Sequence, residues 1–598
     1  MATFVVADID PANERDDEQA IALLLADQTR FNIVGLVADA PDGVTTGYGV
    51  LTAAYEADRA KLETATGNTG LFLTQAQLDA RTVQGSQIDN PSAGYWTAAQ
   101  WESNANAMQA HNAAQAMIAA AQAHGSTAGS PQTNPLGKLW VFVQGGFTTI
   151  AQALYEAIDL GQLPDIIDRC GFMFQSTHNS YVTRNAWRYI NVNQWQAADV
   201  PGKFGTMWAV DGNYLATGLN RLNGGTDQEL WNGVTYGSAM GARLEVERAA
   251  SNYTERAFRA GDASFWFWLS EAMRLGSYDP TNAANRMGPY RTYQDGQGFP
   301  YNRASPLWGP RNRLGGWPTG PGMDPLYSPT RWAPVESVDS IAAGIAALDL
   351  DSAGGWYDNV RQVMGRYRGL EGVRAYSSAE FLMNAGASAT TQIIESVEGD
   401  ASMTLGANDT VETFDPIWTA RGLTFDGTQI ARGTRTTLMD RRRVTVAAVI
   451  RPSTTAAGTR QIVTRDDSVN SALWQFRQNG SALEFVGRGA SATVVASPSG
   501  ALVADVDHLV VAHIDLDSLT VRLRINGVTV ATGTLVNAVP TGGGARLLLA
   551  HRVSSGSPTE RFIGEISYLA MFDSVPLNRL PEVEALARSR VALKGITV

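Results

Sequence analysis

The sequence predicts an α/β domain followed by an all-β sandwich. Up to about residue 335, short apolar runs alternate with longer helical patterns, which is typical of parallel α/β domains. After about residue 399, short strands of alternating apolar and polar residues follow one another between turns. The chain has 598 residues, which is too many for a single hydrophobic core. We therefore expect two main bodies at 1–335 and 399–598, joined by a helical linker region at 336–398.

The first elements predict a mostly parallel sheet flanked by helices. An apolar strand pattern covers 4–7, a helix with one apolar face covers 18–26, and a second apolar strand covers 31–37. Strand, helix and strand in so few residues imply a right-handed parallel crossover. A further central strand is expected at 139–143, followed by a helix with apolar residues over 150–158. In such sheets, functional groups gather at the carboxyl ends of the strands.

The segment 280–335 is rich in Gly, Pro, Trp, Tyr and Arg and has little periodicity. We expect a long ordered loop there. It covers the surface, lines a substrate site or forms an interface between copies, and the sequence leaves these alternatives open.

The second body, 399–598, is expected to form an all-β jelly-roll sandwich. Apolar residues alternate with Thr520, Arg522 and Arg524, and Asn526-Gly527 supplies a hairpin turn. Further strands are expected at 444–450, 474–476, 483–486, 509–514, 547–550 and 566–572.

Composition and charge argue against several classes of function. The net charge is −12 with 46 Lys and Arg residues, so a nucleic-acid partner is not expected. No apolar run approaches the roughly 20 residues that span a bilayer, so membrane insertion is not expected either. The single cysteine, Cys170, cannot form an intrachain disulfide, and we interpret it as a buried thiol.

The N-terminal sequence has no cationic segment followed by an apolar stretch. We therefore expect cytoplasmic synthesis without a signal peptide. Release by lysis or by a dedicated secretion machinery would still place the product in a virion or outside the cell.

Carboxylates gather around the end of the first predicted strand, at Asp8, Asp10, Asp16 and Asp17. Carboxylates so close together repel one another unless a cation or protons neutralise them, and oxygen ligands favour Ca²⁺ or Mg²⁺. The simpler interpretation is that one carboxylate caps the following helix while the others are solvated. That interpretation accounts for one or two of the four aspartates.

Two sequence blocks resemble the nucleoside hydrolase family. The first comprises residues 8–25 with 33–42. The second is Val143-Gln-Gly-Gly-Phe-Thr-Thr-Ile-Ala-Gln-Ala-Leu154, which looks like the Gly-Gly-Leu-Thr-Asn-Ile-Ala stretch of the family. A weaker third match lies at 259–265. Asp262 stands there at the place of an aspartate that lies late in the family's sequence and returns to the metal.

This resemblance implies a Ca²⁺ site formed by Asp10, Asp17, the backbone carbonyl of Gln144 and Asp262. It also implies that Asp16 faces the sugar hydroxyls and that Asp10 is the base that deprotonates the attacking water. The chemistry is consistent with these roles, because Ca²⁺ lowers the pKa of a bound water and nearby carboxylates stabilise a developing oxocarbenium ion.

The sequence departs from the family pattern at three places. The loop between Pro11 and Asp16 is longer and includes Arg15, and Asp42 replaces the sugar-binding asparagine. Gly261 stands where some members have the histidine that protonates the leaving base. His178 is the best substitute acid or ribose contact, and its alternative role is that of an ordinary polar loop residue.

The C-terminal half resembles laminin G or concanavalin-like sandwiches at 422–427, 444–450, 523–528 and 562–572. Such domains often bind glycans, although the same strands serve equally well as a spacer or an assembly surface.

Two hypotheses follow. The first is a calcium-dependent N-glycosidase that hydrolyses a nucleoside or related ribosyl substrate and carries a glycan-binding module. The alternative is a non-catalytic structural protein of a phage virion, or a host-surface-binding protein, that uses a degenerate hydrolase scaffold. Both expect a small ribosyl or glycan ligand, and both leave open a homo-oligomer or assembly into a particle.

Overall fold

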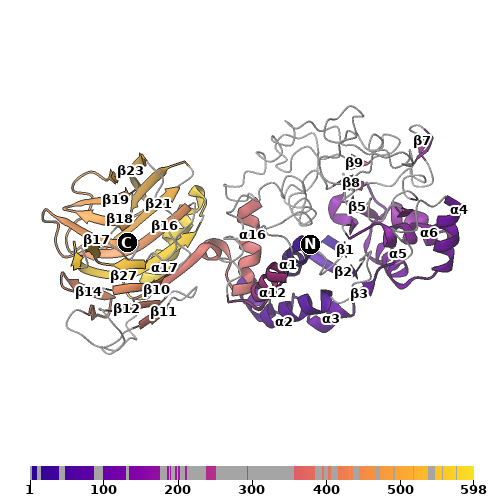
Figure 1. Ribbon diagram of the computed structural model, residues 1–598, viewed down its shortest axis with the longest axis horizontal. Coiled ribbons are helices and arrows are strands. Elements are labelled where there is room, and N and C mark those ends of the chain that lie inside the picture. The colour runs from indigo at the N-terminus through magenta and orange to yellow at the C-terminus, as the bar shows by residue number, and fades with distance from the viewer. Residues whose placement is uncertain are drawn as a thin grey trace. The chain divides into compact units, whose positions relative to one another are not determined.

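The computed structural model describes two compact units, shown in Figure 1. Unit 1 contains residues 1–231, 238–350 and 354–371, and unit 2 contains 232–237, 351–353 and 372–598. The described residues of unit 1 are 3–9, 15–38, 47–86, 98–129, 134–143, 145–174, 238–250 and 356–371, with short pieces at 185–186, 189, 195–197, 200–201, 209–211 and 292–293. Those of unit 2 are 237, 372–383, 393–395, 402–405, 415–429, 431–435, 443–466, 472–488, 492–515, 518–536, 546–554, 557–573 and 575–598.

The sheet of unit 1 has the strand order β3-β2-β1-β4-β5-β8-β9. Its strands are β1 (Thr3–Ile9), β2 (Phe31–Ala38), β3 (Thr82–Gln84), β4 (Leu139–Val143), β5 (Cys170–Phe174), β8 (Ala209–Asp211) and β9 (Thr292–Tyr293). All neighbouring pairs are parallel except β8 with β9, which is antiparallel. Of the aromatic-rich segment 280–335, only β9 is described, so its predicted role lies outside the described residues.

Helices cover both faces of this sheet (Figure 1). One group consists of α1 (Arg15–Ala26), α2 (Gly47–Thr66), α3 (Gln75–Asp79), α12 (Ala239–Ala250) and α16 (Trp356–Gly365), and the other of α4 (Ala98–Ala107), α5 (Asn112–His124), α6 (Thr148–Asp159) and α7 (Leu163–Ile167). Val141 and Val143 of β4 pack in one core cluster with Ile150 and Leu154 of α6. Trp140, which alternates with these strand residues, is also fully buried, as expected for a central parallel strand.

The segment after α16 packs directly on α1. Tyr367 donates a hydrogen bond from its hydroxyl to the carbonyl of Ala22 at 2.7 Å. Arg366 donates to the carbonyl of Ala26 at 3.0 Å and to Oδ1 of Asp27 at 3.2 Å. Burial raises the pKa of the Tyr367 phenol, which therefore remains a donor. These contacts make residues 356–371 an integral part of unit 1.

Unit 2 contains two sheets of eight described strands each. The first has the order β13-β14-β27-β16-β21-β22-β23, with β10 also paired to β27, and the second has the order β11-β12-β15-β24-β17-β18-β19-β20. The first sheet comprises β10 (Ser377–Leu382), β13 (Ile417–Trp418), β14 (Leu423–Asp426), β16 (Arg443–Pro452), β21 (His508–Asp515), β22 (Thr520–Ile525), β23 (Val528–Thr534) and β27 (Ile563–Asp573). The second comprises β11 (Ile393–Glu395), β12 (Ser402–Leu405), β15 (Ala431–Arg435), β17 (Thr459–Asp466), β18 (Ala472–Asn479), β19 (Ala482–Arg488), β20 (Ala492–Ala496) and β24 (Arg546–Leu549).

Alternation along β16 explains how unit 2 is layered. Val446 and Ala448 pack in the core between the sheets, whereas Ala447 and Val449 point to the opposite face. Helix α17 (Leu580–Ala592) covers that opposite face with apolar side chains that include Val583. The all-β sandwich predicted from the sequence is thus confirmed, with a C-terminal helix added to it.

The predicted hairpin is also present. Asn526 and Gly527 have φ values of 50° and 91°, and Ile525 pairs with Val528 across the turn. Positive φ at both central residues is the geometry that an Asn-Gly turn favours.

The region 336–398, expected to be a helical linker, includes both helix and strand in its described part. After α16 the chain forms β10, whose residues pair with β27, and then β11 of the second sheet. The strand forms because Phe381 is buried in the sandwich core, so tertiary packing decides the local structure.

Within the described residues, no helix is both long enough and apolar enough to cross a bilayer.

Candidate functional site

The candidate site lies at the carboxyl edge of the unit 1 sheet. Asp8 of β1 pairs with Val37 of β2 on one side and with Val143 of β4 on the other. The next pair, Ile9 with Ala38, ends both strands at the same level. Because these strands are parallel, the segments that follow them all start from one edge. The predicted site residues Asp10, Asp42 and Gln144 follow these strand ends in sequence, but they lie outside the described residues.

Asp17 is the predicted metal ligand whose side chain the structure describes. It lies in the first turn of α1 and is 1% exposed. Asp16 precedes it in the same helix, with its side chain outside the described part, and His178 and Asp262 are outside it altogether. Among the described residues, no group of three or more His, Cys, Asp or Glu side chains is placed to hold a metal ion.

A second buried carboxylate, Glu18, adjoins Asp17. Arg243 of α12 donates to Oε1 of Glu18 at 2.6 Å, and the glutamate side chain is fully buried. A buried carboxylate needs such a cationic partner, because transfer of an unpaired charge from water is very costly. This ion pair therefore fixes the start of α1 against α12. No local sequence pattern predicts this pair, since the two residues are 225 positions apart.

A serine that sequence reasoning missed also lies at this edge. Gly85 donates its N–H to the carbonyl of Ala38 at 2.8 Å, and Ser86 donates its N–H to Oγ1 of Thr149 at 2.9 Å. Ser86 is 1% exposed, and its hydroxyl has no hydrogen-bond partner among the described residues. An unpaired buried hydroxyl costs about 1–3 kcal/mol, so this position is unusual.

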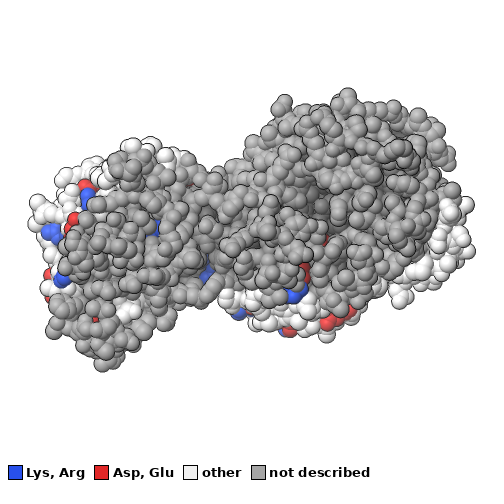
Figure 2. Space-filling view, viewed as in Figure 1, with Lys and Arg blue, Asp and Glu red and all other residues white. Residues whose placement is uncertain are grey.

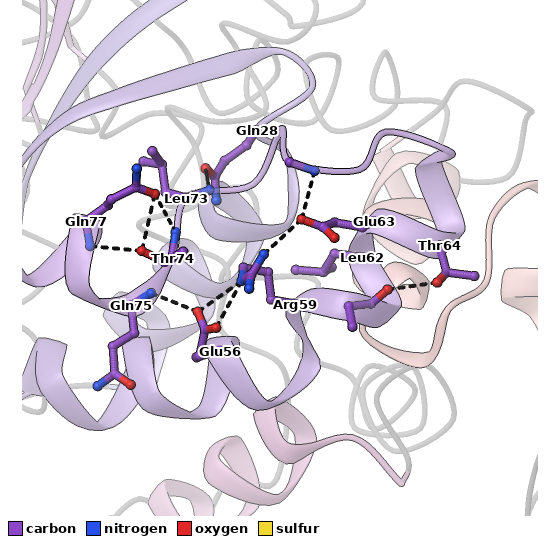
Figure 3. Close-up of polar contacts among 12 residues, drawn as sticks. Gln28, Glu56, Arg59, Leu62, Glu63, Thr64, Leu73, Thr74, Gln75 and Gln77 are labelled. Carbon is purple, nitrogen blue, oxygen red and sulfur yellow. Dashed lines mark hydrogen bonds and ion pairs between the residues drawn. The ribbon is translucent and has the colours of Figure 1, made fainter.

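The polar network at the far end of α2 is structural (Figure 3). Arg59 donates from Nε to Glu56 and from Nη1 to Glu63, while Gln75 donates its N–H to Glu56. Thr74 and Gln77 form a capping box at the start of α3. Both glutamates of this network already accept hydrogen bonds. Only the start of α2 lies near the carboxyl edge of the sheet, where the Tyr48 hydroxyl donates to the carbonyl of Val37, and the helix runs away from that edge. We therefore exclude this network from the site.

Unit 2 has a polar ladder on the outer face of its second sheet. Gln461 donates from Nε2 to Oε1 of Gln475 at 3.1 Å, and Arg477 donates to the same oxygen at 3.0 Å. Arg477 also donates from Nε to Glu484 at 2.9 Å. Gln475 is 0% exposed and Glu484 is 6% exposed, so these groups chiefly stabilise the sheet.

On the face drawn in Figure 2, described acidic and basic side chains lie close to one another.

Each of the two units matches a known protein family. Residues 2–208 match the family described as "Cellulose-binding Sde182, nucleoside hydrolase-like domain". Residues 425–578 match the family described as "Concanavalin A-like lectin/glucanases superfamily". The chain joins a nucleoside hydrolase-like domain to a concanavalin-like domain. The first match ends before α12 and α16 of the nucleoside hydrolase-like domain, and the second contains neither β10 nor α17 of the concanavalin-like domain.

Solved structures show only distant likeness. The CBM40 module of the Ruminococcus gnavus IT-sialidase, bound to α2,3 sialyllactose, is 14% identical over 27% of this chain and 94% of its own, with a TM-score of 0.24. Domain 4 of the Geobacillus stearothermophilus arabinanase AbnA, in complex with arabinotriose, is 15% identical over 33% and 92%, with a TM-score of 0.26. The Trypanosoma rangeli sialidase is 14% identical over 35% and 32%, with a TM-score of 0.27. Scores this low support no argument about fold or function. No curated protein matches the sequence.

Proposed function

We propose that the protein is a calcium-dependent N-glycosidase that hydrolyses a nucleoside or a related ribosyl substrate, and that its concanavalin-like domain binds a glycan. The observation that supports the enzymatic part best is that β1, β2 and β4 end within one residue of one another in the sheet. The segments that contain Asp10, Asp42 and Gln144 start from these ends, which are adjacent in the sheet. Parallel α/β sheets bind their ligands at this edge.

The one proposed ligand with a described side chain is a carboxylate, which suits a hard cation. Asp17 supplies a carboxylate that is almost fully buried at the start of α1. The proposed partners Asp10, Asp262 and the carbonyl of Gln144 are also oxygen donors, and Ca²⁺ prefers oxygen. Calcium, when bound, would lower the pKa of a water and bind sugar hydroxyls.

The protein's own side chains have separate roles in the proposed reaction. Asp10 accepts the proton of the water that attacks the anomeric carbon. Asp16 accepts hydrogen bonds from the sugar hydroxyls and thereby orients the ring. The carboxylates together stabilise the positive charge that builds up on the sugar in the transition state. His178 is the proposed donor of a proton to the leaving base, at a site where Gly261 cannot supply one.

Calcium should stabilise the nucleoside hydrolase-like domain through Asp17. A ligand at one hundred times its Kd raises the free energy of unfolding by about 2.7 kcal/mol, so the melting temperature should fall when a chelator removes calcium. In Asp17→Asn most of this calcium-dependent difference should disappear. Differential scanning calorimetry with and without chelator measures it.

Asp159→Asn is the matched control, because Asp159 ends α6 with an exposed side chain bonded to Gln109. Its melting temperature should fall on addition of chelator as much as that of the wild type. If the fall is equally large in Asp17→Asn and Asp159→Asn, Asp17 is not part of the proposed site.

A non-catalytic binding protein, such as a virion component that recognises a host surface, is the second candidate. It is favoured by the lengthened loop with Arg15, by Gly261, and by a family description that calls the protein Sde182 cellulose-binding. If the protein is a non-catalytic binding protein, it should be retained on insoluble cellulose and should release no base from any nucleoside. Sedimentation with cellulose, with and without soluble cello-oligosaccharide as competitor, tests the retention. Recovery of the chain in the supernatant at every cellulose concentration would remove the support that the family description gives.

A further inference from the structure

Ser86 lies where the ends of three elements of unit 1 meet. It follows β3, whose last residue, Gln84, pairs with Ala38 at the end of β2. Its N–H is bonded to Oγ1 of Thr149, in the first turn of α6, at 2.9 Å. Ser86 is therefore held at the same carboxyl edge from which the segments with Asp10, Asp42 and Gln144 start.

The hydroxyl of Ser86 is buried and unpaired within the part of the chain that the structure describes. The residue is 1% exposed, and Oγ has neither donor nor acceptor there. The hydroxyl of Thr82, four residues earlier, shows the usual situation, because it donates to the carbonyl of Leu78 at 3.0 Å. Native proteins rarely leave a buried polar group unpaired, and the exceptions gather at functional sites.

We propose that Ser86 Oγ is a binding residue for a hydroxyl group of the sugar ring that occupies this edge. A serine hydroxyl both donates and accepts, as a sugar hydroxyl does, so one pair satisfies either orientation. It is also neutral, so it contacts the sugar without competing with the carboxylates for a cation. This inference rests on the proposed function for the choice of a ribosyl ligand, whereas the unpaired hydroxyl is a property of the protein alone.

The ligand-free protein provides the first test. Ser86→Ala removes an unpaired group and keeps the backbone N–H that binds Thr149, so its melting temperature should equal or exceed that of the wild type. Thr82→Val, the control, removes a hydroxyl that has a partner and should lower the melting temperature. If Ser86→Ala lowers the melting temperature as Thr82→Val does, the hydroxyl has a partner in the folded protein and the proposal is wrong.

Ligand binding provides the second test. Isothermal titration with D-ribose in the presence of Ca²⁺ should give a Kd about five- to tenfold higher for Ser86→Ala than for the wild type, the range expected for one neutral hydrogen bond. Thr82→Val should bind D-ribose as the wild type does. A parallel titration with cellobiose distinguishes a ribosyl ligand from a glucosyl one. Equal D-ribose affinity in wild type and Ser86→Ala, or no D-ribose binding to either, would overturn the proposal.

The two proposals fail in different ways. If the wild type binds D-ribose more tightly than Ser86→Ala does but hydrolyses no nucleoside, the proposed reaction is wrong and the role of Ser86 stands. If the wild type hydrolyses nucleosides and Ser86→Ala binds D-ribose equally well, the role of Ser86 is wrong and the reaction stands.

Discussion

Val583→Asp is expected to unfold the concanavalin-like domain or to detach α17 from it. Val583 is fully buried against the outer face of the first sheet, in a cluster with Val449, Leu509 and Tyr568. The substitution loses about 1.5–3 kcal/mol of apolar burial and places a carboxylate in a cluster of apolar side chains. We expect a loss of more than about 4 kcal/mol, a large part of the 5–15 kcal/mol by which domains are typically stable.

Leu593→Asp provides the control for this substitution. Leu593 follows α17 directly and is 84% exposed, so the same change there should alter the free energy of unfolding by less than about 0.5 kcal/mol. Urea unfolding followed by circular dichroism measures both variants. Similar losses in the two would mean that α17 is not packed as described.

Arg366→Ala is expected to destabilise the nucleoside hydrolase-like domain by about 3 kcal/mol. The Arg366 side chain is 10% exposed and the Asp27 side chain 0% exposed, so the carboxylate would lose a partner that water cannot replace. The carbonyl of Ala26, at the end of α1, would lose its donor as well. Arg366→Lys should recover only part of the loss. Nη1 of Arg366 bonds both Ala26 and Asp27 while Nη2 bonds Glu371, and a lysine has no planar fork with which to hold both sides. Urea unfolding monitored by tryptophan fluorescence checks this series.

Arg30→Ala tests whether the burial of the arginine determines how much stability its removal costs. Arg30 pairs with the same carboxylate, but its side chain is 30% exposed. Its removal should therefore cost only about 1 kcal/mol. If Arg30→Ala costs as much as Arg366→Ala, the contact between residues 356–371 and α1 does not determine the stability of the domain.

The fold was predictable where the sequence pattern is local. The alternation of apolar and polar residues along β22 and the Asn526-Gly527 turn need no partner to be recognised, and both appear in the structure. The strand β10 was not recognised, because only its pairing with β27 makes residues 377–382 extended. Helix α17 was not predicted either, because its apolar residues alternate with charged ones and form a core only after they pack on the outer face of the first sheet.

The candidate site was predictable only in its residue types. The strand that ends at Ile9 and the aspartates around it pointed to the carboxyl edge of the sheet, where the structure places the ends of β1, β2 and β4. The contacts that fix this edge join residues far apart in sequence, such as Glu18 with Arg243 and Ser86 with Thr149. No local pattern contains such pairs, because they exist only after the chain has folded.

The release of free base from nucleosides tests the central claim most directly. With Ca²⁺ present, the wild type should release base and ribose in equal amounts from at least one member of a purine and pyrimidine nucleoside panel, and a chelator should suppress the release. Asp10→Asn should be slower by about 10²–10⁴-fold, as expected when a general base is removed. Folded, calcium-saturated wild type that releases no base from any nucleoside, or an Asp10→Asn variant as active as the wild type, would contradict the claim.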